Sequence, residues 1–190
     1  MNLKIGIIIG STRPTRAGKT ITDWFYSQVK DTPDVKFDII DLKTENLPFL
    51  SEPQSAVTGV YEQEKSRAWS KKIADYDGFV FVTSEYNHGY PAPLKNAIDT
   101  LFHEWSKKPV AFVGYGGLGG SRAIEQLIPV IARTGAVPLA APTLNITNVW
   151  SAIDDAGNVK PENIMGDHEK LVENLIRWAK TLKPSRESVK

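Results

Sequence analysis

The sequence predicts an α/β protein built on one parallel sheet with helices on both faces. Apolar runs of strand length alternate with amphipathic stretches of helix length over most of the 190 residues. Such alternation is typical of strand–helix–strand units, and uninterrupted apolar strands are typical of parallel sheets buried on both faces. The length suits one core, so we expect a single domain over residues 1–183 and a disordered polar tail over residues 184–190.

Five segments have the character of buried strands. The first is apolar apart from Lys4 and Gly6, and the third is the run Phe79-Val80-Phe81-Val82. The predicted strands cover residues 3–9, 35–40, 79–82, 109–113 and 136–140.

Five further segments carry apolar residues at helical spacing. In one of them, Leu94, Ala97, Ile98 and Leu101 form a single apolar stripe. We expect Pro129 to kink the fourth helix. The predicted helices cover residues 19–29, 61–76, 93–105, 122–133 and 168–182, and the stretches 44–59 and 142–166 are expected to be irregular.

Charge and cysteine content exclude several classes of function. Lys plus Arg number 23 and Asp plus Glu number 22, so the net charge of +1 gives no reason to expect a nucleic-acid or membrane partner. The absence of cysteine excludes disulfides, thiolate metal sites and cysteine nucleophiles, and it fits a cytoplasmic protein. The acidic residues near 154 and 167 lack converging partners, so we expect no metal site.

The loop after the first strand, residues 10–19, has the composition of a phosphate site. It combines hydroxyl groups, Arg13 and Arg16, glycines and the N-terminus of a helix, which favours an anion. A polar, solvated turn is the alternative. Gly18-Lys19-Thr20 matches the end of a nucleotide-binding P-loop, but Arg13 stands where that motif needs its first glycine.

The loop after the third strand, residues 83–99, suits a planar heteroaromatic ring. It places Glu85, Tyr86, Asn87, His88 and Tyr90 at the carboxyl end of a predicted parallel strand. Ligands bind at that edge of open α/β sheets, and aromatic faces with amide and carboxylate edges match a flat polar ring.

Three motifs together resemble the NADPH-dependent FMN reductase family, which includes chromate, quinone and azo-compound reductases. They are Gly10-Ser11-Thr12-Arg13-Pro14, the run Glu85–Pro91, and Leu94-Lys95-Asn96-Ala97-Ile98-Asp99. The resemblance extends over about residues 4–140. One departure is Ser84, where the family usually has proline before Glu-Tyr-Asn.

The resemblance implies a flavodoxin-like fold, with a five-stranded parallel sheet in the order 2-1-3-4-5. It implies bound FMN, with the phosphate at Ser11, Arg13 and Arg16 and the ring beside Glu85, Tyr86 and Asn87. His88 either contacts the ring or caps the turn. The full cofactor-binding set expected is Ser11, Arg13, Arg16, Gly18, Lys19, Glu85, Tyr86, Asn87, His88, Tyr115, Gly116 and Gly117.

The glycine-rich run after the fourth strand, residues 114–120, matches G-x-G-x-x-G literally. A dinucleotide site of this kind belongs after the first strand of its unit and needs an acidic residue about twenty positions later, and residues 136–141 contain none. In the resembling family this loop backs the flavin ring, where Tyr115, Gly116 and Gly117 can approach closely. A flexible turn is the alternative.

These observations favour an oxidoreductase that takes electrons from NADPH or NADH through FMN to a quinone, free flavin, azo compound or similar small acceptor. The flavin carries the chemistry, so no further catalytic residue is expected. A flavodoxin-type electron carrier and a flavin-sensing interaction module are the alternatives.

The resembling family is commonly dimeric or tetrameric, and two irregular loops carry spare apolar side chains that suit a homodimer or homotetramer. These are Leu47, Phe49 and Leu50 in one loop and Val149 and Trp150 in the other. Trp150 is assigned to either the core or an interface.

Overall fold

The structure is a computed structural model that describes residues 2–187. Within that range the strands are β1 (Leu3–Ile9), β2 (Val35–Asp41), β3 (Gly78–Ser84), β4 (Pro109–Tyr115), β5 (Val137–Pro138), β6 (Leu144–Ile146) and β7 (Ile164–Met165). The α-helices are α1 (Ala17–Val29), α2 (Leu42–Glu45), α3 (Glu64–Ala74), α4 (Ala92–Asp99), α5 (Ser121–Arg133) and α6 (His168–Glu187). Short 3-10 turns occur at Ala56–Thr58, His103–Trp105 and Pro161–Asn163.

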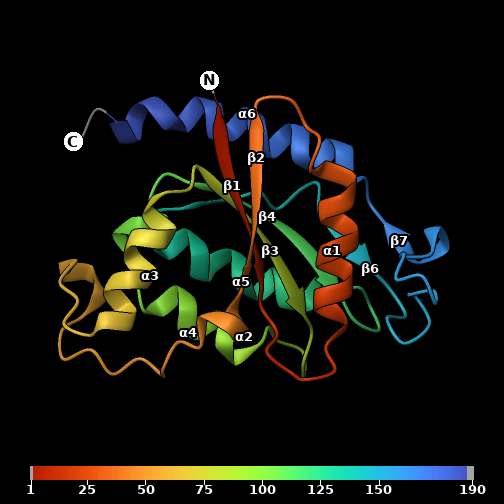
Figure 1. The fold of residues 1–190 in the computed structure, drawn as a ribbon, viewed down its shortest axis with the longest axis horizontal. Helices are drawn as coiled ribbons and strands as arrows, with labels where there is room; N and C mark the ends of the chain where they lie inside the picture. Colours follow the sequence, from red (N-terminus) through yellow and green to blue (C-terminus); the bar gives the residue numbers. More distant parts are fainter. Residues whose placement is uncertain (1, 188–190) are drawn as a thin grey trace.

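A single twisted sheet has the strand order β2-β1-β3-β4-β6-β7, and β5 pairs with the start of β4. The first four strands are parallel and in the predicted order. In Figure 1 the carboxyl ends of β1 and β3 lie at the bottom of the view, and α1 and α3 flank the strands on opposite sides. The flavodoxin-like α/β class is therefore confirmed.

Two hydrophobic layers cover the sheet, one on each face. Side chains from α1 and α6 pack on one face against alternate residues of β1, β3 and β4. Side chains from α3, α4 and α5 pack on the other face against the intervening residues. Both faces of the central strands are buried, which explains why those strands read as continuous apolar runs.

The predicted fifth strand, residues 136–140, is wrong in extent, and the described sheet has seven strands instead of five. Only Val137 and Pro138 pair with β4, where the amides of Val137 and Leu139 donate to the carbonyl oxygens of Lys108 and Val110, and the strand ends before Pro142, a residue that disfavours a continued strand. The chain rejoins the sheet as β6 beside the carboxyl end of β4, and β7 adds an antiparallel edge.

All five helix predictions differ from the structure at their ends, and α1 and α5 begin two residues and one residue earlier than predicted. The helix expected over 93–105 stops at Asp99, and the one expected over 61–76 covers 64–74. Helix α6 continues through Pro184 to Glu187, where Arg186 and Lys183 bond Asp77, so residues 184–187 of the expected tail are helical. Residues 188–190 lie outside the described part.

Candidate functional site

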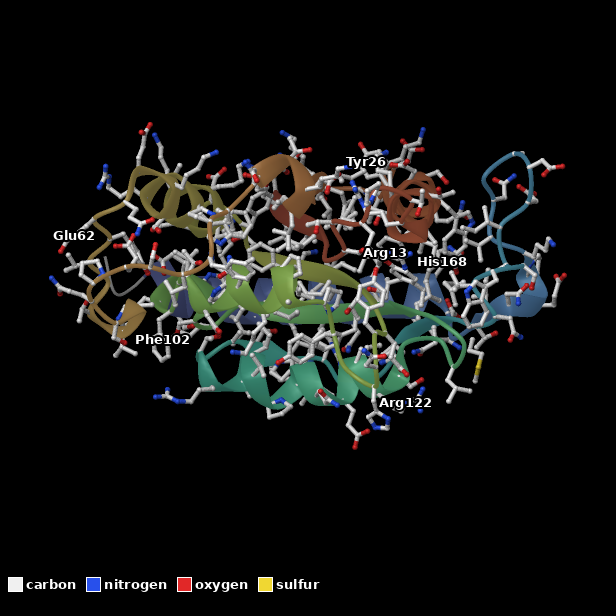
Figure 2. All side chains as sticks on the ribbon, turned by 90° about the horizontal axis from the view of Figure 1, so that it is seen from below. Arg13, Tyr26, Glu62, Phe102, Arg122 and His168 are labelled. Carbon is white, nitrogen blue, oxygen red and sulfur yellow. The ribbon has the colours of Figure 1, made fainter. Side chains whose placement is uncertain are left out.

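A cavity of about 620 Å³ opens at the carboxyl edge of the sheet. Three loops bound it, following β1, β3 and β4, and Figure 2 looks onto this edge from below, with Arg13 and Arg122 on opposite sides of it. The lining residues are Arg13, Thr15, Arg16, Ala17, Ser84, Glu85, Tyr86, Asn87, His88, Tyr115, Gly116, Gly117, Leu118, Arg122, Val149 and Trp150. Nine of the twelve predicted cofactor-binding residues are among them, so the loops after β1, β3 and β4 do converge.

Ser11, Gly18 and Lys19 were predicted in the site but do not line the cavity. Ser11 is buried, and its hydroxyl lies 2.6 Å from that of Tyr86, so it joins the first loop to the second. Lys19 pairs with Asp23 one turn along α1, with both side chains about half exposed. Lys19 is therefore occupied on the outer surface of the helix, and the structure does not bring it to the cavity.

The loop before α1 holds two arginines in different states. The Arg16 side chain is only 7% exposed, forms an ion pair with Asp41 and donates from Nη1 to the carbonyl oxygen of Arg13 at 3.3 Å. The Arg13 guanidinium lies 5.8 Å from the ring centre of Tyr86. No side chain caps the first turn of α1. The N–H groups of that turn are therefore left for a ligand at the end of the helix that meets the cavity.

The loop after β3 is a tight turn that presents its residues to the cavity. Tyr86 and Gly89 exchange two backbone hydrogen bonds of 2.8 and 3.1 Å, while Asn87 and His88 adopt φ values of +49° and +72°. Two successive left-handed residues define a type I′ turn, a conformation that asparagine tolerates well. The carbonyl oxygen of His88 accepts from Gln126 at 2.7 Å, which ties the turn to α5.

The Glu85 carboxylate is occupied by α5. It accepts from Arg122 Nε at 2.6 Å and from the Arg122 backbone N–H at 3.3 Å, and the side chain is 7% exposed. A carboxylate at a helix N-terminus is stabilised by the helix dipole and by the free N–H groups there. Because its carboxylate is bound to Arg122, Glu85 is left to contact a ligand through its backbone groups.

The glycine loop after β4 is fastened to the segment after β6. The amides of Asn148 and Val149 donate to the carbonyl oxygens of Gly117 and Gly116, both at 3.3 Å. A Cβ atom at Gly117 would lie 3.3 Å from the ring of Trp150, which is itself 85% exposed. The loop thus carries an exposed aromatic ring at the mouth of the cavity.

Three buried polar atoms of this cavity have no hydrogen-bond partner. Among residues 2–187, the buried side-chain atoms left in that state are Arg16 Nε, Ser84 Oγ and Tyr115 Oη, and all three residues line the cavity. Burial raises the pKa of Tyr115 to about 12. Because unpaired buried polar groups are costly and rare, their concentration here indicates a polar ligand.

Sequence reasoning missed Arg122, Ser84 as a lining residue, and the place of Trp150. Arg122 was taken only as the start of a helix, and nothing local shows that Glu85 would bring it to the site. Trp150 was assigned to the core or an interface, and only the backbone bonds to Gly116 and Gly117 reveal its position.

The chain matches the NADPH-dependent FMN reductase family over residues 3–151. It belongs to that family. Among curated relatives, an NAD(P)H-dependent FMN reductase of Schizosaccharomyces pombe is 46% identical over 126 residues, which cover 65% of this chain and 63% of that protein, slightly under two thirds. A 2-hydroxy-1,4-benzoquinone reductase of Burkholderia is 30% identical over 187 residues, covering 95% and 98%.

The fold is shared with solved flavoenzymes. FerB of Paracoccus denitrificans, described as an NAD(P)H:(acceptor) oxidoreductase, superposes with a TM-score of 0.72 at 21% identity, covering 95% of this chain and 98% of FerB. At that identity the likeness shows the fold alone.

The residues of the cavity fit FMN, the cofactor of the family. Arg13 and the first turn of α1 offer charge and N–H groups to a phosphate, and the Tyr86–Gly89 turn and the glycine loop offer backbone and aromatic surface to a ring. The unpartnered atoms of Arg16, Ser84 and Tyr115 lie along the same cavity. Within the described residues, no group of three or more metal-ligating side chains is assembled, and no helix has the length and apolar character to cross a bilayer.

Proposed function

We propose that this protein binds FMN in the cavity and uses NADPH or NADH to reduce small acceptors such as quinones, free flavin or azo compounds. The observation that carries the proposal is the convergence of nine predicted residues and three unpartnered buried polar atoms on one cavity. The names of the relatives, an FMN reductase and a benzoquinone reductase, support the same class of reaction.

In this proposal the chain binds and orients, while hydride acceptance from the nicotinamide and electron delivery to the acceptor are the chemistry that bound FMN supplies. Arg13 and the α1 N-terminus hold the phosphate, with Ser11 and Arg16 supporting that loop. The turn at Asn87 and His88 and the glycines at 116 and 117 hold the ring. The Glu85–Arg122 pair fixes the second loop to α5.

Binding of FMN is tested by adding the flavin to the purified protein and following quenching of its fluorescence. We expect a yellow protein that releases FMN and not FAD, because the site offers one phosphate loop and no second pyrophosphate site. No quenching at micromolar concentration would refute the proposal.

Turnover is tested by NADPH oxidation in the presence of a quinone. Because the nicotinamide and the acceptor would use the same open side of one cavity, we expect them to bind in turn and to give parallel double-reciprocal plots. Intersecting plots would favour a ternary complex in which the nicotinamide and the acceptor are bound at the same time. Flavin binding without NADPH oxidation would favour an electron carrier or a sensing module.

We also propose a homodimer or homotetramer in the cytoplasm. Phe49 is 82% exposed and Leu50 46% exposed, and Asn96 fixes this segment by bonding the Pro48 carbonyl at 2.8 Å and the Leu50 amide at 2.9 Å. An apolar ring held in solvent on a fixed segment is better explained by a partner surface than by a free loop.

A further inference from the structure

Ser84 is the last residue of β3 and is only 2% exposed. Residues alternate across a strand, so Ser84 follows Val80 and Val82 onto the α1 face of the sheet. Its partner on the neighbouring strand is Tyr115, the last residue of β4. The two hydroxyl-bearing residues therefore end adjacent strands on the side of the sheet where the cavity opens.

Neither hydroxyl makes a hydrogen bond of ordinary geometry within the described residues, although both are nearly inaccessible to solvent. Thr83, the preceding residue, contrasts with this, since its hydroxyl donates to the Ser84 carbonyl at 3.1 Å. A buried hydroxyl without a partner destabilises the protein that contains it, so a partner supplied by a ligand would recover that loss.

The position of these hydroxyls selects the part of the ligand that meets them. The Tyr115 hydroxyl lies beside the first turn of α1, since a Cβ atom at Gly18 would clash with it, and Ser84 directly precedes the loop that carries the turn at Asn87 and His88. The α1 end suits the phosphate of FMN and the turn suits its ring. The part between phosphate and ring is the ribityl chain, whose hydroxyls can both donate and accept hydrogen bonds.

We propose that the Ser84 hydroxyl, with that of Tyr115, anchors the ribityl chain of bound FMN. The inference rests on the proposed function and assigns a binding role to Ser84, a position where this chain departs from the proline usual in the family. Proline has no hydroxyl, so the anchor would be a property of chains with serine here.

If the hydroxyl is an anchor, its removal should raise the stability of the apoprotein and lower its affinity for FMN. In Ser84→Ala the apoprotein loses an unpaired buried hydroxyl, so its thermal midpoint should rise by about 2–4 °C. The same variant should bind FMN roughly five- to tenfold more weakly, because one neutral hydrogen bond to the ligand is lost. Tyr115→Phe should behave in the same way.

Three flavins locate the contact. Fluorescence titrations of the full chain with FMN, riboflavin and lumiflavin, which lacks the ribityl chain, give three dissociation constants for each protein. Ser84→Ala should weaken FMN and riboflavin by the same factor and leave lumiflavin unchanged. Equal weakening of all three flavins, or no weakening of any, would overturn the anchor.

Thr134→Val provides a matched control. Thr134 is also buried, but its hydroxyl donates to the Ile131 carbonyl at 2.8 Å, and Thr134 does not line the cavity. Thr134→Val should therefore lower the thermal midpoint of the apoprotein and leave all flavin affinities unchanged. A Ser84→Ala apoprotein that is less stable than wild type, or insoluble, would also overturn the proposal. If the wild-type protein does not bind FMN, the proposed function is refuted. If it binds FMN and Ser84→Ala binds it equally well, only the Ser84 anchor is refuted.

Discussion

At the scale of single residues, the two arginines of the first loop are not equivalent. Arg13 has an exposed side chain that lies against the Tyr86 ring, whereas Arg16 is buried and already bound to Asp41. Arg13→Ala should therefore weaken FMN by roughly tenfold to a hundredfold, the loss of a charge-assisted hydrogen bond, and leave riboflavin almost unchanged. Titration of both flavins checks this expectation, with Lys19→Ala as the control that should change neither affinity.

Arg16→Ala should behave differently because it removes the ion-pair partner of the Asp41 carboxylate and frees the Arg13 carbonyl. We expect a loss of about 1–3 kcal/mol in the free energy of unfolding, with FMN and riboflavin both weakened. Urea denaturation of the apoprotein measures the first effect. Unchanged stability with a loss confined to FMN would show instead that Arg16 acts on the phosphate directly.

Residue types and spacing were enough to predict most of the site, because the carboxyl ends of parallel strands meet at one edge. Arg122 could not be predicted in this way, since its place depends on the carboxylate of a residue 37 positions earlier. A role for Lys19 stays a prediction: the loop around it has the composition of a phosphate site, while Asp23 at i+4 holds its side chain on the helix surface.

At the scale of elements, the contact between α1 and β4 depends on a missing side chain. A Cβ atom at Gly18 would lie 2.4 Å from the Tyr115 hydroxyl oxygen and 3.1 Å from the adjoining ring carbon. Gly18→Ala should therefore cost about 1–3 kcal/mol of stability by overpacking. In urea denaturation, Tyr115→Phe should stabilise the Gly18→Ala protein by more than it stabilises wild type. An equal gain in both backgrounds would mean that the clash is relieved elsewhere.

The end of α3 is closed by a buried lysine that precedes β4. Lys108 Nζ donates to the carbonyl oxygens of Ile73 and Ala74 at 2.8 and 3.1 Å, and burial lowers the pKa of Lys108 to about 7 despite the nearby Asp77. Between about pH 7 and 10.5 the unfolded chain therefore binds a proton that the native state does not, so this group makes stability rise with pH.

The measurement is the free energy of unfolding of wild type and Lys108→Met from pH 6 to 10. The advantage of wild type over the variant should grow as pH rises above 7, because the cost of a buried ammonium disappears. A constant difference across that range would show that Lys108 stays protonated in the native state.

Element prediction failed where prolines interrupt a pattern. Residues 136–140 are apolar enough for a strand, but pairing with β4 stops after Val137 and Pro138, short of Pro142, and β6 pairs with the carboxyl end of β4 instead. The strands β1, β3 and β4 were predictable because each is buried on both faces and leaves a nearly uninterrupted apolar run.

At the scale of the whole molecule, the cavity is formed by one chain but its rim is apolar and exposed. Trp150 is 85% exposed and Leu118 61% exposed at its mouth, and Phe49 is 82% exposed on the segment that Asn96 fixes to α4. Enzymes that handle reduced flavins gain by excluding water, and two-fold association is the commonest way for a chain to cover such surfaces.

We therefore expect a dimer or a dimer of dimers, with Phe49 in the contact. Phe49→Asp should raise the dissociation constant of the dimer at least tenfold, since exposed aromatic anchors contribute strongly to interfaces, and it should also weaken FMN if the interface borders the cavity. Met165→Asp places the same charge on another exposed apolar side chain, which is 61% exposed on β7, and should leave assembly unchanged. Sedimentation of the FMN-bound protein at tens of micromolar measures assembly. A wild-type species with the mass of one chain would refute the interface, and a Phe49→Asp dimer as stable as wild type would place the contact elsewhere on the surface.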